Sequence, residues 1–147
     1  MKKYIVVTAL LLTATLVRAQ ILTPVKWAYA AKKINDKEAV VYLKATINKG
    51  WHIYSQSVGE GGPIKTSFAF AKSDDYTVTG KPAEPLPKKK FEKAFDMNVT
   101  YFDNTVIFQQ KVKINKGKPV IKGILTYMAC SNRECLPPED LEFSVAL

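Results

Sequence analysis

The sequence is organised around the segment TYMACSNRECLPP, residues 126–138. This segment contains both cysteines of the chain, Cys130 and Cys135, with four residues between them. A disulfide between them needs Cα atoms within about 7 Å, so the backbone must double back in a tight loop. A bridge that closes so short a loop adds only about 2 kcal/mol on the loop-length formula. Stability is therefore a weak reason for the pair. A small exposed loop that thiolate attack can open and close is the stronger one.

Outward from this segment, apolar residues alternate with polar ones, which is typical of half-buried β-strands. The strand that enters the segment covers residues 120–128, and the closing strand after the two prolines contains Leu141, Phe143 and Val145. Turn signals such as Asn48-Lys49-Gly50 separate the strands at a spacing of about 8–12 residues. The other predicted strands are 25–31, 39–47, 51–54, 64–70, 76–78, 99–102 and 105–114.

This pattern of short strands, with no convincing helix after the N-terminal segment, predicts a single all-β domain with the architecture of an antiparallel β-sandwich. Three segments are expected to be irregular. Residues 55–62 are polar and rich in glycine, and residues 81–90 contain three prolines and cannot supply a central strand. Residues 91–97 have no clean period and contain two phenylalanines. The cysteine loop then forms the corner between the last two strands, at one end of the sandwich, and Cys130 ends a strand.

The N-terminus has the three regions of a secretory signal peptide. Two lysines precede an apolar run over residues 4–16, and a small-residue pattern follows at residues 17–19. We expect residues 1–19 to be removed by cleavage after Ala19, which leaves residues 20–147 as one exported domain. The run is too short for a membrane span, and no later segment is apolar enough to cross a bilayer. Disulfides form and persist outside the cytosol, so both redox states of the cysteine pair are available there.

The formal charge of the chain is +9 at pH 7. Three of these charges, Lys2, Lys3 and Arg18, belong to the predicted signal peptide, which leaves +6 on the mature domain. The charges are scattered and an exported protein rarely meets nucleic acid, so a nucleic-acid partner is not expected. The single run of lysines, Lys88-Lys89-Lys90, lies beside prolines and is interpreted as a solvated loop. The alternative is a landing patch for an acidic partner.

Three stretches of the chain, taken together, resemble the periplasmic N-terminal domain of the thiol:disulfide interchange protein DsbD, an immunoglobulin-like redox module. The cysteine loop followed by Pro-Pro is the specific part of the resemblance, and the other stretches are weak alone. The stretches are Gly50-Trp51-His52-Ile53-Tyr54, residues 95–103, and residues 126–139. The resemblance therefore implies an immunoglobulin-like antiparallel β-sandwich.

The resemblance also implies a function. In that family the cysteine pair takes electrons from a thioredoxin-like domain, itself supplied by a membrane-embedded domain, and delivers them to oxidised periplasmic proteins. Carried over by position, the redox pair is Cys130 and Cys135. Tyr54 lies against the active site, and Phe95 is the cap residue that shields the pair until a partner arrives. We expect a periplasmic protein-disulfide reductase component that works by thiol–disulfide exchange and needs no metal or organic cofactor.

The sequence departs from the pattern of that family at three places. The cysteine spacing is one residue shorter than in the best-known members, which bears on the geometry and the potential of the bridge. Lys93-Ala94 replaces the acidic pair that precedes the cap aromatic. His52 stands where the family has a tyrosine near the cysteines. Because the chain ends at Leu147, we expect the membrane protein and the thioredoxin-like donor to be separate proteins.

Each candidate site residue also has a structural interpretation. Cys130 and Cys135 fit a permanent disulfide, as in an immunoglobulin-like adhesion or assembly domain. His52 is the only histidine. It fits a packing residue as well as a group that exchanges a proton with a cysteine. Phe95 fits a core residue as well as a cap. Opposite charges flank the second cysteine, so the sequence leaves open which sulfur attacks.

A binding module is the alternative from a different functional class. Cys130, Cys135, Met128, Met97 and His52 are soft or borderline ligands of the kind that bind Cu(I). The methionines are equally good core residues, and the Pro-Pro signature favours the redox family. A hydrolase is not expected, because a single histidine in no recognisable motif does not indicate a catalytic triad.

Overall fold

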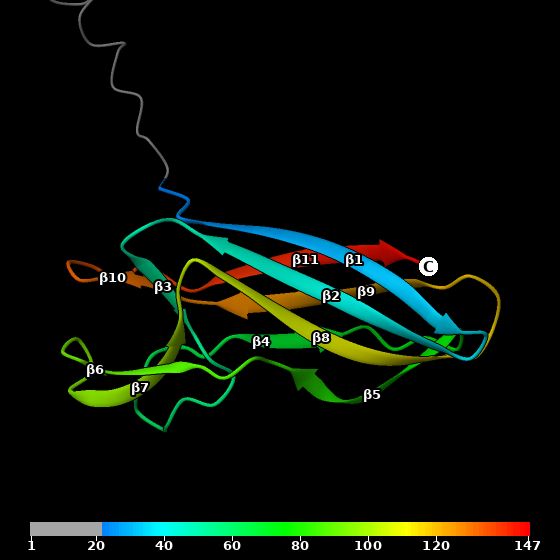
Figure 1. The fold of residues 1–147 in the computed structure, drawn as a ribbon, viewed down its shortest axis with the longest axis horizontal. Helices are drawn as coiled ribbons and strands as arrows, with labels where there is room; N and C mark the ends of the chain where they lie inside the picture. The colour runs from blue at the N-terminus through cyan, green and yellow to red at the C-terminus, as the bar shows by residue number, and fades with distance from the viewer. Residues whose placement is uncertain (1–21) are drawn as a thin grey trace, which may run out of the picture.

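The computed structural model describes residues 22–147, and this part of the chain folds into eleven β-strands without a helix (Figure 1). The predicted signal peptide, with its cleavage site after Ala19, lies outside the described residues. Over the range that the structure describes, no helix is long and apolar enough to cross a membrane. The prediction of an all-β protein is confirmed.

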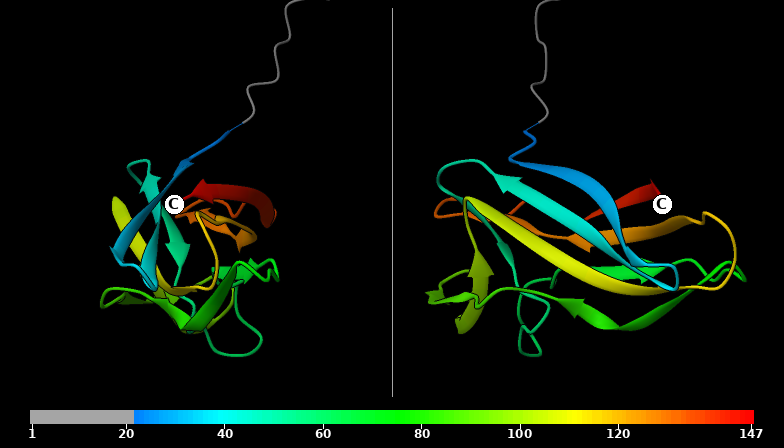
Figure 2. Two further views of the ribbon diagram at one scale, coloured as in Figure 1. Left: turned by 90° about the vertical axis from the view of Figure 1, so that its right-hand side faces the viewer. Right: turned by 45° about the vertical axis from the view of Figure 1, so that its right-hand side comes forward.

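Two antiparallel sheets face each other and form the sandwich. The first has the order β1 (Val25–Asn35), β2 (Glu38–Ile47), β8 (Thr105–Ile114) and β5 (Tyr76–Ala83). The second has the order β11 (Glu139–Ala146), β9 (Val120–Tyr127) and β4 (Ser67–Phe70). In the end-on view of Figure 2, β1, β2 and β8 form one layer, and β9 and β11 lie in the other. This is the antiparallel sandwich that the sequence predicts.

The core between these sheets follows from the strict alternation along the long strands. Every second residue of β8 is buried over its whole length, and β2 has the same period. Phe108 lies at the centre of the core. Its ring stacks on Trp27 at 6.1 Å between centroids and meets Phe102 edge-on at 5.8 Å. Each such buried side chain contributes about 1.5–3 kcal/mol, so a few of them outweigh the contribution of about 2 kcal/mol that the short disulfide loop adds.

A third, smaller sheet extends from one end of the sandwich, on the left in Figure 1. Its order is β10 (Ala129–Ser131), β3 (Trp51–Tyr54), β7 (Met97–Phe102) and β6 (Lys88–Glu92). Three of these strands continue long strands of the sandwich. β3 follows β2 after three residues, β7 precedes β8 by two, and β10 follows β9 after one. The sandwich therefore sets the position of the small sheet.

Two residues with positive φ make the changes of direction between the sheets. Gly50, with φ 86°, ends the turn between β2 and β3, and Asn104, with φ 59°, lies between β7 and β8. Glycine and asparagine enter this left-handed region at the lowest steric cost. The turn that the sequence predicts at residues 48–50 is confirmed, and so is the break between the strands predicted at 99–102 and 105–114.

The proline-rich segment 81–90 is not the irregular connection that the sequence predicts. β5 continues through Pro82 to Ala83, and β6 begins at Lys88. Both strands are edges of their sheets, and the register of β5 shifts between Thr79 and Ala83. Proline is tolerated at such places because its nitrogen is not needed for a ladder hydrogen bond. The prolines therefore exclude a central strand, as predicted, but not an edge strand.

The segment 91–97, predicted to be an irregular loop, belongs to the β6–β7 hairpin. All five residues of β6 pair with β7, and only residues 93–96 form the turn between them. Asp96 closes this turn with φ 51°. The loop prediction was wrong because an edge strand with one covered face need not show a clean apolar period. The strand predicted for residues 64–70 is shorter than expected and begins at Ser67.

Gly123 on β9 lies directly opposite Phe143 on β11 and Phe70 on β4, whose rings meet at 5.4 Å. A Cβ on Gly123 would lie 2.6 Å from the Phe143 ring and 2.6 Å from the backbone oxygen of Ala69. We predict that Gly123→Ala lowers the free energy of unfolding by about 1–3 kcal/mol through overpacking. Urea unfolding measures it. The neighbouring exposed substitution Lys122→Ala should change this energy by less than about 0.5 kcal/mol, and an unchanged midpoint for Gly123→Ala would contradict the prediction.

Candidate redox site

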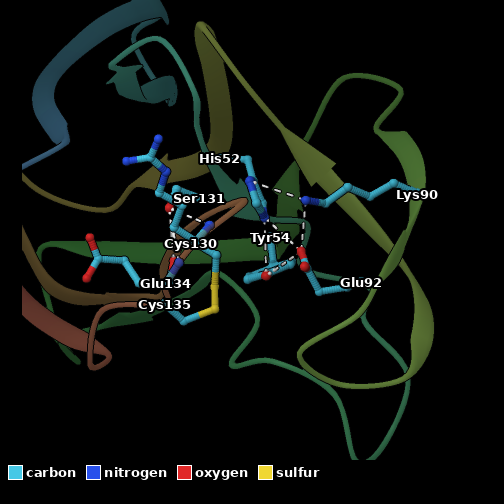
Figure 3. The surroundings of a disulfide bond; sticks show 9 residues. His52, Tyr54, Lys90, Glu92, Cys130, Ser131, Glu134 and Cys135 are labelled. Carbon is cyan, nitrogen blue, oxygen red and sulfur yellow. Dashed lines mark hydrogen bonds and ion pairs between the residues drawn. A yellow bond between two sulfur atoms is a disulfide. The ribbon is translucent and has the colours of Figure 1, made fainter.

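Cys130 and Cys135 form a disulfide at the edge of the small sheet (Figure 3). The two residues lie directly opposite each other in an antiparallel bridge, with their Cα atoms 4.0 Å apart. Backbone hydrogen bonds of 2.8 and 2.9 Å flank the pair on either side. This is the non-hydrogen-bonded type of antiparallel pair, in which the side chains approach most closely. The tight loop expected from the cysteine spacing is therefore present.

The side chain of Ser131 organises the loop between the cysteines. Its Oγ accepts hydrogen bonds from the backbone N–H groups of Arg133 and Glu134, both at 3.2 Å, and donates to the oxygen of Glu134 at 3.3 Å. A serine hydroxyl at the start of a turn can hydrogen-bond the backbone two residues on, which favours the reversal. Ser131 was not predicted as a site residue, although a serine at the start of a four-residue loop is a usable signal.

The two cysteines differ in exposure. Cys130 is fully buried, with 0% of its surface exposed, whereas Cys135 is only partly buried. The prediction that Cys130 ends the strand 120–128 needs correction. β9 ends at Tyr127, and Cys130 is the middle residue of a separate strand, β10, which pairs with β3 in another sheet. The chain thus passes from the β11-β9-β4 sheet to the small sheet within one largely apolar segment. The alternation of apolar and polar residues alone does not reveal this change of sheet.

One face of the small sheet collects the candidate site residues. Cys130 on β10 lies directly opposite His52 on β3. Tyr54, two residues further along β3, lies opposite Tyr101 on β7. Because side chains alternate along a strand and directly paired residues share a face, these four side chains belong to one face of the sheet.

The opposite face of the same sheet joins the core of the sandwich. Ala129, Ile53 and Phe102 alternate with the site residues along their strands, pair with one another across the sheet, and are buried in the main core. A slip of one residue in this register would exchange the two faces and expose the apolar set. Core packing therefore determines which side chains reach the disulfide.

A hydrogen-bond network covers the site face beside the disulfide (Figure 3). Oε2 of Glu92 lies 2.8 Å from Nζ of Lys90 and 3.0 Å from Nε2 of His52. The same oxygen accepts a hydrogen bond from the hydroxyl of Tyr54 at 3.1 Å. Nδ1 of His52 lies 3.4 Å from Nζ of Lys90. Because an ammonium group only donates, Nδ1 is the acceptor, and Nε2 carries the hydrogen that is donated to Glu92.

Burial and the local charges set the titration of this network. Desolvation and the charge of Lys90 lower the pKa of His52, against the opposing effect of Glu92. Desolvation alone would raise the pKa of Glu92, but the ion pair with Lys90 and the hydrogen bonds from Tyr54 and His52 outweigh it and hold that pKa below its usual value. Desolvation, reinforced by the carboxylate of Glu92, raises the pKa of Tyr54. At neutral pH, His52 and Tyr54 are therefore uncharged.

Phe95 lies in the turn of the β6–β7 hairpin and packs beside the cysteines. It belongs to a small apolar cluster with Tyr54, Cys130 and Cys135, and this cluster is separate from the main core. The ring of Phe95 meets that of Tyr54 edge-on at 6.4 Å between centroids. Phe95 is partly buried. It is thus not a residue of the sandwich core.

The five residues predicted for the site lie together. Figure 3 shows Cys130, Cys135, His52 and Tyr54, and Phe95 packs against the same cluster. Two further residues, Glu92 and Lys90, belong to the site although the sequence did not indicate them as site residues. Residues 81–97 were expected to be irregular, and Lys90 was interpreted only as part of the lysine run. In a strand the two positions share a face, so a correct strand prediction for this segment would have revealed them.

The lysine run 88–90 is not the solvated loop that the sequence predicts. It begins strand β6, and two of its three lysines are ion-paired. Lys88 lies 2.7 Å from a carboxylate oxygen of Asp103, and Lys90 pairs with Glu92. Lys90 also lies over the ring of Tyr101, 5.1 Å from its centroid.

The sulfur-containing residues of the candidate Cu(I) ligand set lie close together. Met97 and Met128 pack in the same apolar cluster as the two cysteines. His52, however, bonds to Glu92 and Lys90. Among residues 22–147, no group of three or more His, Cys, Asp and Glu side chains is placed to hold a metal ion. The sulfur ligands are thus clustered, while the imidazole is engaged elsewhere.

These features define a class of protein: a β-sandwich domain with a disulfide on a short loop beside a polar network. The family model described as thiol:disulfide interchange protein DsbD, N-terminal, matches residues 18–147. The chain therefore belongs to the DsbD N-terminal domain family, as the resemblance predicted, and is a thiol–disulfide interchange module. A comparison with curated proteins finds no significant match.

Solved structures of similar fold include three relatives. The DsbD N-terminal domain of Neisseria meningitidis in the reduced form is 20% identical over 82% of this chain and 84% of that chain, with a TM-score of 0.54. The same domain in complex with the PilB N-terminal domain is 21% identical over 85% and 87%, with a TM-score of 0.55. The N-terminal periplasmic domain of ScsB from Proteus mirabilis is 20% identical over 86% of this chain and 49% of that chain, with a TM-score of 0.54. These likenesses confirm the immunoglobulin-like fold.

Folding lowers the pKa of His52 below its ordinary value of 6.5. The unfolded chain therefore binds a proton more readily, so stability is lost as pH falls below that value. We predict that the free energy of unfolding decreases between about pH 7.5 and about pH 5.5, and that His52→Gln loses less over this interval because no other histidine is present. The lowered pKa of Glu92 acts only below its ordinary value of 4.5. Urea unfolding at the two pH values checks this, and equal losses in both proteins would contradict it.

Proposed function

We propose that this protein is an exported thiol–disulfide interchange module that relays reducing equivalents through a reversible Cys130–Cys135 disulfide. The observation that supports this most directly is the asymmetry of the bridge, with one sulfur-bearing residue buried and the other partly exposed on a loop. A structural bridge gains little here, because it closes a four-residue loop within one corner of the fold. A redox bridge needs a sulfur that a partner can reach.

In the reducing half-reaction, a thiolate of the donor attacks Sγ of Cys135, the more exposed residue. A bond forms between the donor and Cys135, and the Cys130–Cys135 bond breaks. Its electron pair moves to Sγ of Cys130, which takes up a proton. The second cysteine of the donor then attacks the mixed disulfide and releases the oxidised donor and the Cys135 thiol. The module gains two electrons and two protons, which the donor loses.

In the oxidising half-reaction, the thiolate of Cys135 attacks a disulfide of the client protein. Cys130 then resolves the mixed disulfide and restores the bridge, and the client leaves with two thiols. The cross-strand pairing, with Cα atoms 4.0 Å apart, keeps Cys130 in place for this step. The partial exposure of Cys135 supports its assignment as the attacking residue and that of Cys130 as the resolving residue, a choice that the sequence left open.

The donor in this proposal is a thioredoxin-like protein that a membrane electron-transfer protein keeps reduced, and the acceptors are oxidised periplasmic proteins. The complex solved for the Neisseria DsbD N-terminal domain with the PilB N-terminal domain supports docking of a second domain on this fold. The periplasmic description of the matching Proteus mirabilis domain supports the same location for this chain. None of the exchange steps requires a metal or an organic cofactor.

His52, Tyr54 and Phe95 shape the surroundings of the sulfurs in this proposal. His52 lies across from Cys130, and Tyr54 belongs to the cysteine cluster and donates its hydroxyl hydrogen to the carboxylate of Glu92. Phe95 is the cap, because it packs on the cysteine cluster from a turn that can swing away when a partner docks.

If Phe95 is the cap, its removal exposes the sulfurs to small reagents. We predict that Phe95→Ala raises the rate at which glutathione disulfide oxidises the reduced protein by about tenfold or more, since the open state no longer has to be populated first. Alkylation and mass spectrometry follow the reaction. Phe91→Ala is the matched control, because Phe91 is 55% exposed, belongs to the same hairpin and lies outside the cysteine cluster. A rate equal to that of the unmodified protein for Phe95→Ala would remove the cap role.

The relay itself is tested by trapping a mixed disulfide with a thioredoxin-fold protein. Cys130→Ser leaves the exposed Cys135 thiol without its resolving partner, so we predict a stable adduct. Cys135→Ser leaves only the buried sulfur and should give about tenfold less adduct, because attack requires access. Non-reducing electrophoresis and mass spectrometry measure both. Comparable trapping by the two variants would contradict the assignment of the attacking residue.

Two other outcomes would favour the alternative functions. If neither variant traps a partner and the bridge of the folded protein resists a mild dithiol, the disulfide is structural and the domain is an interaction module. If trapping fails and the reduced protein binds one Cu(I) tightly through the sulfur cluster, the metal-binding alternative is favoured.

A further inference from the structure

Glu92 lies at the junction between the polar network and the cap. It is the last residue of β6, and residues 93–96, here called the cap turn, follow it directly. The backbone oxygen of Glu92 accepts a hydrogen bond from the N–H of Phe95 at 3.1 Å. Its carboxylate reaches across the sheet to His52 and Tyr54 on β3. One residue thus connects the cap turn with the strand that pairs with Cys130.

The backbone of the hairpin is joined to β3 only at the end remote from the cap turn. The β3–β7 ladder has two residue pairs at the end of β7. The next backbone hydrogen bond toward the cap turn joins Ser55 N to the oxygen of Thr100 at 3.0 Å. Beyond it, within residues 22–147, no backbone hydrogen bond ties the hairpin to β3. The side chains of Glu92 and Lys90 make the polar connection there.

The carboxylate of Glu92 is costly to leave without partners. The residue is only 7% exposed, and one oxygen, Oε2, meets the ammonium group of Lys90, the ring nitrogen of His52 and the hydroxyl of Tyr54. A buried carboxylate has lost its hydration, which hydrogen bonds and an opposite charge must replace. Because the contacts to β3 are lost together when the hairpin lifts, they favour the closed arrangement.

We propose that Glu92 is a positioning residue that latches the cap turn over the disulfide and so holds Phe95 against the cysteines until a partner displaces it. This inference rests on the proposed function, in which Phe95 is the cap. Glu92 acts through Phe95 and touches neither sulfur. His52 and Tyr54 are the anchors of the latch on β3, and Lys90 neutralises the charge of the carboxylate.

The test uses glutathione disulfide, a small oxidant that needs an open cap but has no docking surface. The thiolate of Cys135 attacks it and releases one glutathione, and Cys130 resolves the mixed disulfide and releases the second. We expect Glu92→Ala to raise the oxidation rate by about tenfold, the factor by which losing one hydrogen bond to a charged group changes an equilibrium. Glu92→Gln keeps the shape of the side chain and removes its charge, so its oxidation rate should lie between those of the unmodified protein and Glu92→Ala.

Two further variants distinguish a specific effect on the cap turn from a general loss of structure. Glu84→Ala removes a different carboxylate, a partly buried one that bonds to Ser55 and Gln56 outside the hairpin. The oxidation rate of this variant should match that of the unmodified protein. The double variant Glu92→Ala with Phe95→Ala should react no faster than Phe95→Ala alone, because both open the same cap. The latch proposal would be wrong if the rate increases of the two single variants multiplied in the double variant. It would also be wrong if Glu92→Ala left the oxidation rate unchanged. Should Glu92→Ala fail to fold, Glu92→Gln decides by the same comparison.

The outcome for the latch is separable from that for the relay. If Cys130→Ser traps no thioredoxin-fold protein, the relay is wrong, and the glutathione rates still test the latch. If Phe95→Ala raises the rate and Glu92→Ala does not, the cap stands and the latch is wrong. If neither variant raises it, cap and latch are both wrong, and the trapping experiment still decides the relay.

Discussion

The pairing of β10 with β3 is the interaction on which the site depends. It takes the chain out of the sandwich after Tyr127 and aligns Cys130 with His52. The register is held from behind, because Ala129 and Ile53 belong to the main core and a slip of one residue would expose them. The disulfide then closes the short loop that follows. The core therefore fixes the geometry of the redox pair, although it contains neither sulfur.

The two faces of the small sheet lie in different environments. One face is apolar and continuous with the sandwich, and the other combines the disulfide with a buried ion pair and two uncharged titratable side chains. A buried carboxylate beside an apolar cluster is tolerated because Lys90, His52 and Tyr54 all face it. In this arrangement the polar groups hold the hairpin, while the sulfurs lie in apolar surroundings.

Much of the site follows from local sequence signals, and the missing part has a physical reason. The alternation of β2 and β8 and the cysteine spacing predicted the sandwich and the loop correctly. The prediction was wrong for residues 81–83 and 88–92, where prolines and lysines obscure two edge strands whose stability comes from their neighbours. The error concealed Glu92, and with it the acidic group of the site. In the family that the sequence resembles, an acidic pair precedes the cap aromatic, and Lys93-Ala94 stands at that place in this protein. The carboxylate of this protein is that of Glu92, the residue directly before Lys93.

The sequence by itself determined the strand-forming periods, the turn at Gly50, and the presence of two cysteines close enough along the chain to bridge. These are local properties, set by side-chain alternation, backbone sterics and loop length. Only the tertiary structure decided that Cys130 is fully buried while Cys135 is partly exposed. It also decided that Glu92 on β6 reaches His52 on β3 across the intervening strand β7. Both depend on which strands become neighbours, and that choice is made by packing between segments about 40 to 80 residues apart, which no local pattern encodes.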